Sequence, residues 1–574
     1  AVALVLVNDG RCGTTGWPGG NDCAGGMTAA DLAPLLNIPS MLYSVNSSQA
    51  VFDAVQSGET VTATFGNLPV SPFKIDSTAF HSGTEFESVD PAPAGEENND
   101  GLYNINVASG PTESVSFIPA AALAAGLEGA FFQTDVDVNN KGAEEATFYF
   151  LWLPRGEDNS EPAASETYTL GPGESLQFEN VLAEAFGAEP DVVGALAIVS
   201  SSGDVIAVSR TYNLPGGKVA GTFGQALPAV PSDELIMGTD KQRIIFQSEN
   251  DDFRANVGCV NGNPSDLIVT MELFDNEGNE LEVKTLDLGP WSNGQITRIF
   301  RDHAPLNGYV DVFSNTDGAA YYCYGSVLDN ETSDPTTVLP QVPGDMLDFI
   351  PAAALAAGLE GSFFQTDLDI NNTGSEGVDF NILWLPRGAD NSEPTASETF
   401  FLGAGMGVRY ENVLSEVFGA EPDAVGALAV SATDSSDLIS MSRTYNIPTA
   451  KVAGTFGQAL PGVPMSHMIT PGTTKRIIFL NHNDDFRANV GCVNGVNQAV
   501  RVNIDLYDGA GEMLEARTMD LPPWSNKQFN GLFSAYAPVQ GYADVYTATE
   551  GAYVYCYGSV LDNQTSDPTT VLPQ

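Results

Sequence analysis

The stretch Phe253-Arg-Ala-Asn-Val-Gly-Cys-Val-Asn-Gly262 returns letter for letter at Phe486–Gly495. Other matching residues, such as Trp152 and Trp384, keep nearly the same separation of about 232 residues. Self-similarity at a fixed period is the signature of repeated structural units. The chain therefore contains two large repeats, covering about 109–341 and 342–574.

Each large repeat divides again into two halves. Phe132–Asn140 aligns with Phe253–Asn261, and Ser209–Asn213 aligns with Ser326–Asn330. The alignment predicts four related units behind a separate N-terminal region, 1–112. Their predicted boundaries are 113–230, 231–342, 343–463 and 464–574. At about 110–120 residues, each unit has the size of one small all-β domain.

The repeated units carry a strand period. Val500-Arg-Val-Asn-Ile-Asp-Leu506 alternates apolar and polar residues, which is typical of a strand with one buried face and one wet face. Tyr507–Gly511 then reads as a turn. We predict an all-β fold of four tandem Ig-like β-sandwich units, in two large repeats, behind a small N-terminal β or mixed domain. Asn180–Phe186 and Pro119–Leu127 are each predicted to form a short helix at the end of a sandwich.

Proline-rich joints recur between the predicted units, at Leu227–Pro231, Leu339–Pro343 and Leu460–Pro464. Proline stiffens an extended segment because its ring fixes φ. The joints therefore predict a rod or a compact zigzag of sandwiches.

The chain has six cysteines, and Cys259 and Cys323 are spaced as far apart as Cys492 and Cys556. The half-repeat alignment places aliphatic residues where these cysteines stand: Val138 over Cys259, Ile206 over Cys323, Ile370 over Cys492 and Ile439 over Cys556. Two inward-facing positions in contact across a core could hold either a disulfide or a pair of aliphatic side chains. We therefore predict the disulfides Cys259–Cys323 and Cys492–Cys556.

Cys12 and Cys23 remain, and we expect them to close a local loop. A fully paired set indicates an oxidising compartment. Zinc is the alternative, but the cysteines form no CxxC pair and have no histidine nearby.

The formal net charge is −52, from 74 acidic and 22 basic residues. Such a charge repels nucleic acid and anionic membranes, so neither is an expected partner. The charge fits a solubilising surface for a salty habitat, or acidic faces that bind divalent cations. No apolar run reaches the roughly 20 residues of a membrane helix. Because the chain starts at Ala rather than Met, we expect a signal peptide to have been removed and the protein to be extracellular or at the cell surface.

Two pairs of carboxylates are the candidate metal ligands. Asp135 and Asp137, and likewise Asp367 and Asp369, lie two residues apart on predicted strands and so share a face. With a loop carbonyl they could hold Ca²⁺, and no other cofactor is expected. The alternative interpretation is a solvated strand face.

Several tryptophans, arginines and asparagines are candidates for ligand binding, ion pairing or modification. Trp152, Trp384, Trp291 and Trp524 could stack on sugars or serve as core and hinge packing. Recurring arginines are expected to be paired structural residues: Arg155, Arg210, Arg254, Arg387, Arg443 and Arg487. Asn46, Asn330, Asn372 and Asn563 begin N-x-S/T sequons and are possible glycosylation sites.

No catalytic signature is present in the sequence. The chain lacks G-x-S-x-G, a P-loop, a helix-opening G-x-G-x-x-G and HExxH. The four histidines do not follow the repeat: Tyr536 replaces His303 in the other copy, and Glu249 stands where His482 is expected. Surface histidines are the simpler interpretation, and no catalytic residue is predicted.

Four motifs together resemble a tandem β-sandwich repeat found in secreted, mostly uncharacterised bacterial proteins. They are Phe117-Ile-Pro-Ala-Ala121, Ser209-Arg-Thr-Tyr-Asn213, Gly221-Thr-Phe-Gly-Gln225 and Gly325-Ser-Val-Leu-Asp-Asn330. The resemblance covers about 113–574. It implies an extracellular sandwich array used for surface display or assembly, and it brings no catalytic residues.

The N-terminal segment Ala1-Val2-Ala3-Leu4-Val5-Leu6-Val7 has no polar member, so it must be buried. It is either a central strand of its own domain or a strand donated to the next subunit in a head-to-tail contact. We therefore expect a non-enzymatic extracellular structural protein, a subunit of a filament, sheath or surface layer whose partner is itself. The alternatives are an adhesin or carbohydrate-binding protein that contacts surface glycans, and an accessory part of a secreted hydrolase.

Overall fold

The computed structural model describes residues 113–214, 221–358, 361–447 and 454–574. Residues Ser114–Gln574 form one compact unit, distinct from Ala1–Glu113. The predicted N-terminal domain, the Cys12–Cys23 loop, the Ala1–Val7 strand and Asn46 lie outside the described residues.

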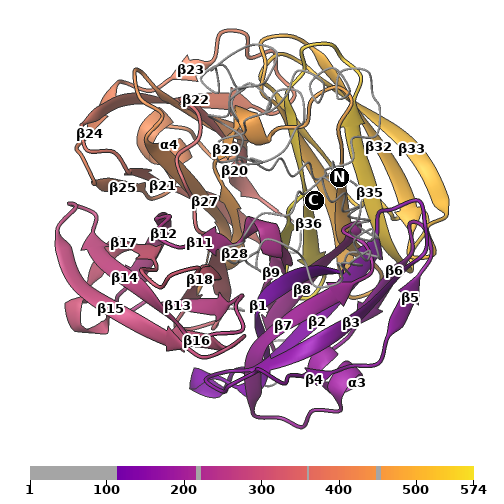
Figure 1. Ribbon diagram of the computed structural model, residues 1–574. Coiled ribbons are helices and arrows are strands. Elements are labelled where there is room, and N and C mark those ends of the chain that lie inside the picture. The colour runs from indigo at the N-terminus through magenta and orange to yellow at the C-terminus, as the bar shows by residue number, and fades with distance from the viewer. Residues whose placement is uncertain (1–112, 215–220, 359–360, 448–453) are drawn as a thin grey trace, which may run out of the picture. The chain divides into compact units, whose positions relative to one another are not determined.

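The part of the chain from Ser114 onward folds into four β-sandwiches, which confirms the predicted all-β class (Figure 1). We call them units 1 to 4 in chain order. Unit 1 contains β1 (Ser114–Ala125), β2 (Phe131–Asn140), β3 (Ala146–Pro154), β4 (Ala163–Ala164), β5 (Tyr168–Leu170), β6 (Ser175–Phe178), α3 (Val181–Phe186), β7 (Val192–Ser200), β8 (Val205–Asn213), β9 (Phe223–Pro228) and β10 (Val230–Pro231). Unit 2 contains β11 (Ile236–Met237), β12 (Gln242–Glu249), β13 (Phe253–Asn261), β14 (Leu267–Asp275), β15 (Glu280–Leu288), β16 (Asn293–Ile296), β17 (Leu306–Phe313), β18 (Ala320–Asp329) and β19 (Pro335–Val338).

Units 3 and 4 repeat units 1 and 2. Unit 3 contains β20 (Leu347–Ala357), β21 (Phe363–Asn372), β22 (Val378–Pro386), β23 (Thr395–Ala396), β24 (Phe400–Leu402), β25 (Gly407–Tyr410), α4 (Val413–Phe418), β26 (Ala424–Ala432), β27 (Leu438–Asn446), β28 (Phe456–Pro461) and β29 (Val463–Pro464). Unit 4 contains β30 (Thr474–His482), β31 (Phe486–Asn494), β32 (Val500–Asp508), β33 (Met513–Leu521), β34 (Asn526–Phe529), β35 (Val539–Thr547), β36 (Val554–Asp562) and β37 (Pro568–Val571).

The half-repeat of the sequence is also a repeat of topology. One layer has the order β5-β3-β7-β1 in unit 1 and β15-β14-β17-β12 in unit 2. The facing layer has the order β6-β2-β8-β9 in unit 1 and β16-β13-β18-β19 in unit 2. In unit 1 the end of β1 also pairs with β2 and so joins the two layers into one sheet. The alternating segment predicted at Val500–Leu506 is β32, whose even-spaced apolar residues enter the core.

The first long strand of every unit is interrupted by a bulge at the same place. In β1 the pairing with β7 shifts between Ile118 and Ala121, and β12, β20 and β30 shift equivalently. The predicted helix at Pro119–Leu127 is therefore wrong, because most of this segment belongs to β1. Proline is accepted inside a sheet at a bulge, where no ladder hydrogen bond is lost. The predicted helix at Asn180–Phe186 is confirmed as α3, and the Asn180 side chain accepts a hydrogen bond from Ala183 N as its N-cap.

Of the two arrangements expected from the proline-rich joints, a rod or a compact zigzag, the rod is wrong. Each unit contacts the next, and unit 4 also contacts unit 1 through hydrogen bonds such as Phe479 N to Asp137. Strands β9, β19, β28 and β37 meet where the four units come together. Two of the joints are themselves strands: β10 pairs with β1, and β29 pairs with β20. The prolines thus end short edge strands instead of spacing the units apart.

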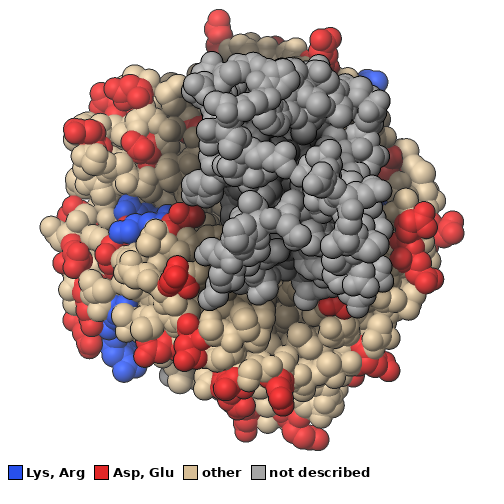
Figure 2. All heavy atoms as spheres, viewed as in Figure 1, with Lys and Arg blue, Asp and Glu red and all other residues tan. Residues whose placement is uncertain are grey.

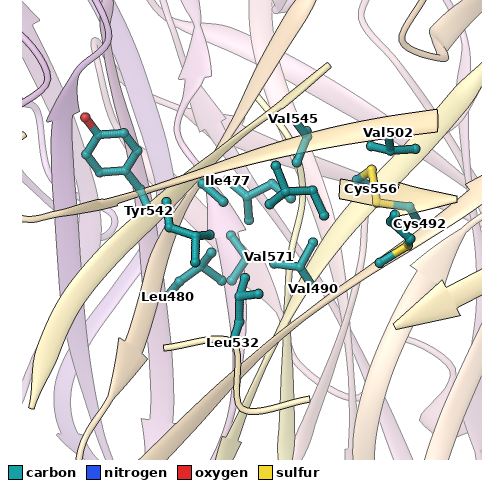
Figure 3. Close-up of a cluster of buried hydrophobic side chains, with 14 of the residues drawn as sticks. Ile477, Leu480, Val490, Cys492, Val502, Leu532, Tyr542, Val545, Cys556 and Val571 are labelled. Carbon is teal, nitrogen blue, oxygen red and sulfur yellow. A yellow bond between two sulfur atoms is a disulfide. The ribbon is translucent and has the colours of Figure 1, made fainter. Parts of the chain in front are cut away.

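The structure holds two disulfides among the described residues, Cys259–Cys323 and Cys492–Cys556. Figure 3 labels the cysteines of the second, in the core of unit 4. Each disulfide joins directly opposed residues of neighbouring strands within one layer, so the bridge does not cross the core. In unit 1 the pair opposite each other at this place is Val138 and Ala207, whereas Ile206 pairs with Asn139. The alignment of Cys323 with Ile206 was therefore one residue out of register. Since a one-residue slip reverses the face, Ala207 lies in the core while Ile206 packs toward unit 4.

Candidate functional site

The predicted metal-ligand carboxylates do not lie on a wet strand face. Asp137 and Asp369 are 4% and 0% exposed, because the outer face of their layer is covered by a neighbouring unit. Asp135 is also buried and accepts hydrogen bonds from Asn180 N at 2.8 Å and from the Tyr212 hydroxyl at 3.2 Å. Asp367 has the matching partners in unit 3, Asn412 N and Tyr445. The solvated-face interpretation is therefore wrong for Asp135, Asp137 and Asp369.

Asp137 and Asp369 lie at two matching contacts between units, which we call seams. The 2–3 seam joins units 2 and 3, and the 4–1 seam joins units 4 and 1. In the 4–1 seam, Asp137 Oδ2 accepts the Phe479 N–H at 2.8 Å. In the 2–3 seam, Asp369 instead meets Arg409, with Nη2 to Oδ2 at 2.8 Å.

Arg409 ties unit 3 to unit 2. Its Nη1 donates to Ser248 and, at 2.9 Å, to Asn307 Oδ1, and its guanidinium lies 4.0 Å from the ring centre of Phe246. In unit 1 the residue at this place is Gln177, which pairs with Asp137 across β2 and β6 as Arg409 pairs with Asp369 across β21 and β25. Asp137 Oδ1 and Gln177 Oε1 are both buried without a hydrogen-bond partner. The 4–1 seam therefore contains a buried carboxyl group that lacks the arginine of its counterpart.

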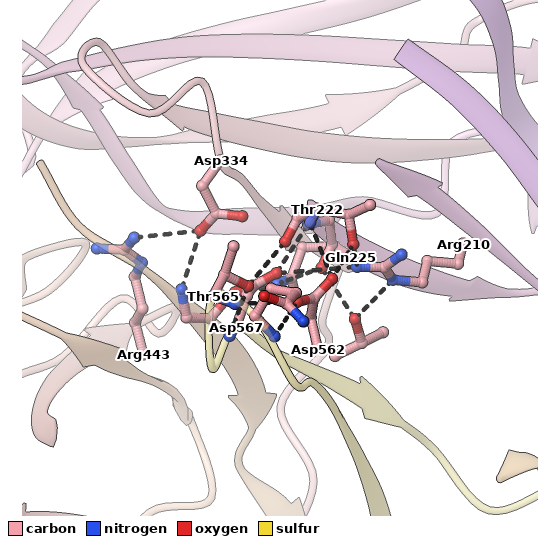
Figure 4. Close-up of polar contacts among 12 residues, drawn as sticks. Arg210, Thr222, Gln225, Asp334, Arg443, Asp562, Thr565 and Asp567 are labelled. Carbon is pink, nitrogen blue, oxygen red and sulfur yellow. Dashed lines mark hydrogen bonds and ion pairs between the residues drawn. The ribbon is translucent and has the colours of Figure 1, made fainter. Parts of the chain in front are cut away.

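A second polar cluster is repeated in both seams (Figure 4). In the 4–1 seam, Asp562 Oδ2 accepts from Thr222 N at 2.8 Å and from Thr222 Oγ1 at 2.9 Å, and Asp567 Oδ2 accepts from Gly224 N at 2.9 Å. In the 2–3 seam, Asp329 accepts from Thr455 N and Oγ1 at 2.7 and 2.9 Å, and Asp334 accepts from Gly457 N at 2.9 Å. Arg210 lies 4.0 Å from Asp567, and Arg443 lies 3.6 Å from Asp334. These two arginines are paired structural residues, as predicted.

Burial dominates the electrostatics of these acids. Loss of solvent around the carboxyl raises the pKa of Asp137 to about 7, although the Phe479 N–H favours the charged form. The same cause raises the pKa of Asp135 to about 6 and the pKa values of Asp334 and Asp348 to about 7. For Asp567, burial together with the nearby Asp334 raises the pKa well above its ordinary range.

The carboxylates do not gather as metal ligands. Across the described ranges, no three side chains of His, Cys, Asp or Glu lie close enough together to hold an ion. The oxygens of Asp135, Asp137, Asp367 and Asp369 are directed to backbone N–H groups, to tyrosines and to Arg409. Asp135 and Asp367 thus fix elements within their own units, whereas Asp137 bonds the next unit directly and Asp369 positions Arg409 to do so.

The tryptophans are packing residues. Trp291 stacks on Phe117 at the contact of units 1 and 2, with ring centres 6.0 Å apart, and Trp524 meets Phe349 at the contact of units 3 and 4, at 6.3 Å. Trp152 and Trp384 pack against Phe186 and Phe418 in units 1 and 3. The structure thus places them as the core-and-hinge interpretation expects.

The exchange of His482 for Glu249 between copies is also structural. His482 Nδ1 accepts from Ala488 N at 3.3 Å, and Glu249 Oε2 accepts from Ala255 N at 3.1 Å. Each side chain thus binds the backbone N–H six residues further along the chain.

The sequon asparagines are engaged in hydrogen bonds. Asn372 is fully buried, and its Nδ2 donates to the carbonyls of Glu376, Leu402 and Gly403, so an attached glycan has no room. Asn330 and Asn563 each accept from an arginine, Arg254 and Arg487 respectively, at 2.8 Å.

An open groove lies on unit 4, with a volume of about 870 Å³. Its lining includes the exposed ion pair of Arg501 and Asp520, whose Nε and Oδ1 are 2.7 Å apart, with Asn503 and Lys527 nearby. Acidic side chains spread over the surface in Figure 2, and basic ones are sparse. The groove is therefore a place where basic residues face outward in a strongly acidic chain.

Sequence reasoning missed the residues that form the seams. Thr222, Asp562 and Asp567 lie within repeated motifs. Repetition alone does not show whether such residues belong to a core, to a turn or to a contact between units. Arg409 carried a signal that was available: Gln177 replaces it in the other copy. A charged residue at a strand position in one copy alone indicates that the two copies meet different surroundings.

Removing the Asp562 carboxylate should weaken the 4–1 seam. Asp562→Ala removes the acceptor of four hydrogen bonds, which are donated by the Thr222 N–H and hydroxyl and by the N–H groups of Gln564 and Thr565. We expect the free energy of unfolding to fall by about 2–3 kcal/mol, since buried donors lose a charged acceptor. Urea titration measures this. Asp329→Ala, at the matching place, should cost about the same.

Asp287→Ala, an exposed position on β15, serves as the control and should change stability by less than about 0.5 kcal/mol. An Asp562→Ala chain as stable as the Asp287→Ala chain would show that the seam cluster contributes little.

Comparisons with known proteins give no family. No protein-family model matches the sequence, and no curated protein matches it. Among solved structures, trypsin-activated alpha-2-macroglobulin from Escherichia coli is similar at 9% identity and a TM-score of 0.10, covering 80% of this chain and 41% of that one. Salmonella alpha-2-macroglobulin reacted with methylamine has 9% identity and a TM-score of 0.11, covering 82% and 40%. The chain thus spans less than half the length of either.

Within the described residues, no helix has the length and apolar character needed to cross a membrane.

Proposed function

We propose that the chain is a non-enzymatic extracellular structural protein that assembles with copies of itself into a filament, sheath or surface layer. The observation that carries the proposal is the use of its buried polar side chains. Asp137, Asp562, Asp329 and Arg409 connect one sandwich unit to another, and Asp369 holds Arg409 in place from within unit 3. Polar residues that could otherwise serve in catalysis or ligand binding thus join the units to one another.

The disulfides support the extracellular part of the proposal. Cys259–Cys323 and Cys492–Cys556 are fully buried in units 2 and 4, and such bridges persist in oxidising surroundings. The acidic surface keeps single chains apart at low salt, so assembly should strengthen as salt screens repulsion over about 8–10 Å.

Negative-stain imaging of material from the native source tests the proposal. We expect polymers with a regular repeat, built from the 60.5 kDa chain. Single particles at every protein and salt concentration would contradict it. Turnover of any glycan or peptide substrate by the pure chain would favour the hydrolase alternative.

Binding of surface glycans is the second candidate, and the groove on unit 4 is the observation that favours it. Asn503, Arg501 and Asp520 offer amide, guanidinium and carboxylate groups suited to sugar hydroxyls. A glycan array should then show binding that Arg501→Ala removes and Arg298→Ala, in unit 2, leaves unchanged. Equal binding by both variants would rule out the groove.

A further inference from the structure

The 2–3 seam and the 4–1 seam are duplicates of one another. In the 2–3 seam, Thr455 N donates to Asp329 Oδ2 and Gly457 N donates to Asp334 Oδ2. In the 4–1 seam, the same atoms of Thr222 and Gly224 donate to Asp562 and Asp567. Both seams also contain apolar packing: Ile439 and Met441 join the core of unit 2, and Val208 joins the core of unit 4. The surface that unit 3 offers to unit 2 is therefore closely matched by the surface that unit 1 offers to unit 4.

The chain divides naturally into two halves at the 2–3 seam. Within each half the joint between units is held as a strand, because β10 pairs with β1 and β29 pairs with β20. Between the halves, the segment from Leu339 to Met346 forms no strand and only one isolated bridge, from Gln341 to Arg243. Val342 and Met346 in this segment are both 53% exposed. Units 1 and 2 thus form one half and units 3 and 4 form the other. The joint between the halves forms no strand and is held by the Gln341–Arg243 bridge, by Ala432 N donating to Met346 O and by Ser466 N donating to Asp345.

The two halves are connected through the two seams, through this segment, and through a contact of units 1 and 3 in which Phe223 packs on Phe456 and Gln225 Nε2 donates to Gly457 O. The eight residues of the segment reach about 26–29 Å when extended. Both disulfides of the described residues lie inside a single unit, so neither bridge ties one half to the other. A half of one chain would therefore find every hydrogen-bond partner of both seams on the opposite half of a second copy.

We propose that two copies of this chain exchange halves, so that units 3 and 4 of one chain dock on units 1 and 2 of another through the same two seams. This rests on the proposed function, for which it gives the contact. Reciprocal exchange gives a closed dimer, and exchange along a row of chains gives an open polymer. Each seam hydrogen bond broken within a chain forms again between chains, so exchange costs little beyond the entropy of association.

The exchange is tested in the full chain by crosslinking across the 2–3 seam, with one new cysteine introduced into each of two preparations. Gly454, with φ of 81°, faces Glu331 across the seam: a Cβ added there would lie 2.7 Å from Glu331 Cβ and 2.5 Å from Asp329 Oδ1, so the local backbone must move apart before a disulfide, whose Cβ atoms lie about 3.5–4.5 Å apart, can form. One preparation carries Glu331→Cys and the other Gly454→Cys, with different affinity tags. The two are unfolded together, refolded at about 0.1–1 mM, where intermolecular docking competes with a tethered half, and oxidised.

We expect a crosslinked heterodimer that carries both tags, in a yield that rises in proportion to protein concentration. A chain with both substitutions should crosslink within itself when refolded dilute, which shows that the pair can form. The matching pair Gly221→Cys and Gln564→Cys should behave alike in the 4–1 seam, since a Cβ at Gly221 would lie 2.8 Å from Gln564 Cβ. A mixture of Glu331→Cys with Asp287→Cys is the control and should give no heterodimer above background.

Full crosslinking of the double variant without any heterodimer from the mixed preparations would overturn the exchange. Failure of the proposed function is recognised separately. Native polymers without heterodimers would mean that assembly uses another contact, whereas heterodimers that stay closed dimers, with no native polymer, would retain the exchange and reject the structural role.

Discussion

Replacing Cys259 by Val and Cys323 by Ala should lower the free energy of unfolding by about 4 kcal/mol while unit 2 keeps its fold. The bridge closes a loop with a sequence separation of 64 residues, which restricts the unfolded chain. Units 1 and 2 share one topology, and unit 1 places Val138 and Ala207 at the same opposed positions. The substitution therefore installs a pair that this fold already accommodates, and no large cavity should form.

Urea unfolding of the variant and the parent chain measures the change, and the parent under reducing agent provides a second estimate. Cys492→Val with Cys556→Ala should have a similar cost in unit 4, where the bridge is identical in spacing. A double replacement that left stability unchanged would show that the bridges do not restrict the unfolded state, and loss of all β structure would show that unit 2 depends on its bridge to fold.

The sandwich fold could be predicted because its signal is local. The alternation in Val500–Leu506 and the repeated stretch at Phe253 each describe one strand. A strand with apolar residues at every second position has one apolar face, which a second layer must cover. The register of the disulfide could not be fixed so well. Matching Ser209 to Ser326 by letter placed Ile206 opposite Val138, whereas pairing across β2 and β8 places Ala207 there.

The contacts between units could not be predicted, because they follow from the packing of whole sandwiches. Asp137 occupies a polar position of an alternating strand, and alternation predicts a wet face there. The structure covers that face with unit 4. The segment Pro119–Leu127 is likewise predicted as a short helix, but Ile118, Ala121 and Leu123 enter the core of unit 1 from a strand. Tertiary burial outweighs the small helix preference of alanine.

An Asp→Asn substitution should raise the free energy of unfolding when made in the 4–1 seam and lower it when made in the 2–3 seam. Burial raises the folded-state pKa of Asp137 to about 7, so the folded chain holds a proton that the unfolded chain releases near pH 4. Its contribution to stability is fully present below about pH 4 and is lost as the pH rises through about 7. Asp137→Asn keeps an acceptor for the Phe479 N–H and offers a donor to Gln177 Oε1, which has no partner. At pH 8 this variant should be more stable than the parent, by on the order of 3 kcal/mol.

Asp369→Asn, at the matching place in the 2–3 seam, should instead destabilise the chain by about 3–5 kcal/mol, because the buried Arg409 loses its counter-charge. Urea unfolding of both variants at pH 8 and pH 4.5 measures the two effects. At pH 4.5 the advantage of Asp137→Asn should nearly vanish, since Asp137 in the parent is then protonated in the folded state. Destabilisation by Asp137→Asn at pH 8 would mean that the Asp137 carboxylate is charged and well solvated, and that the 4–1 seam is not closed as described.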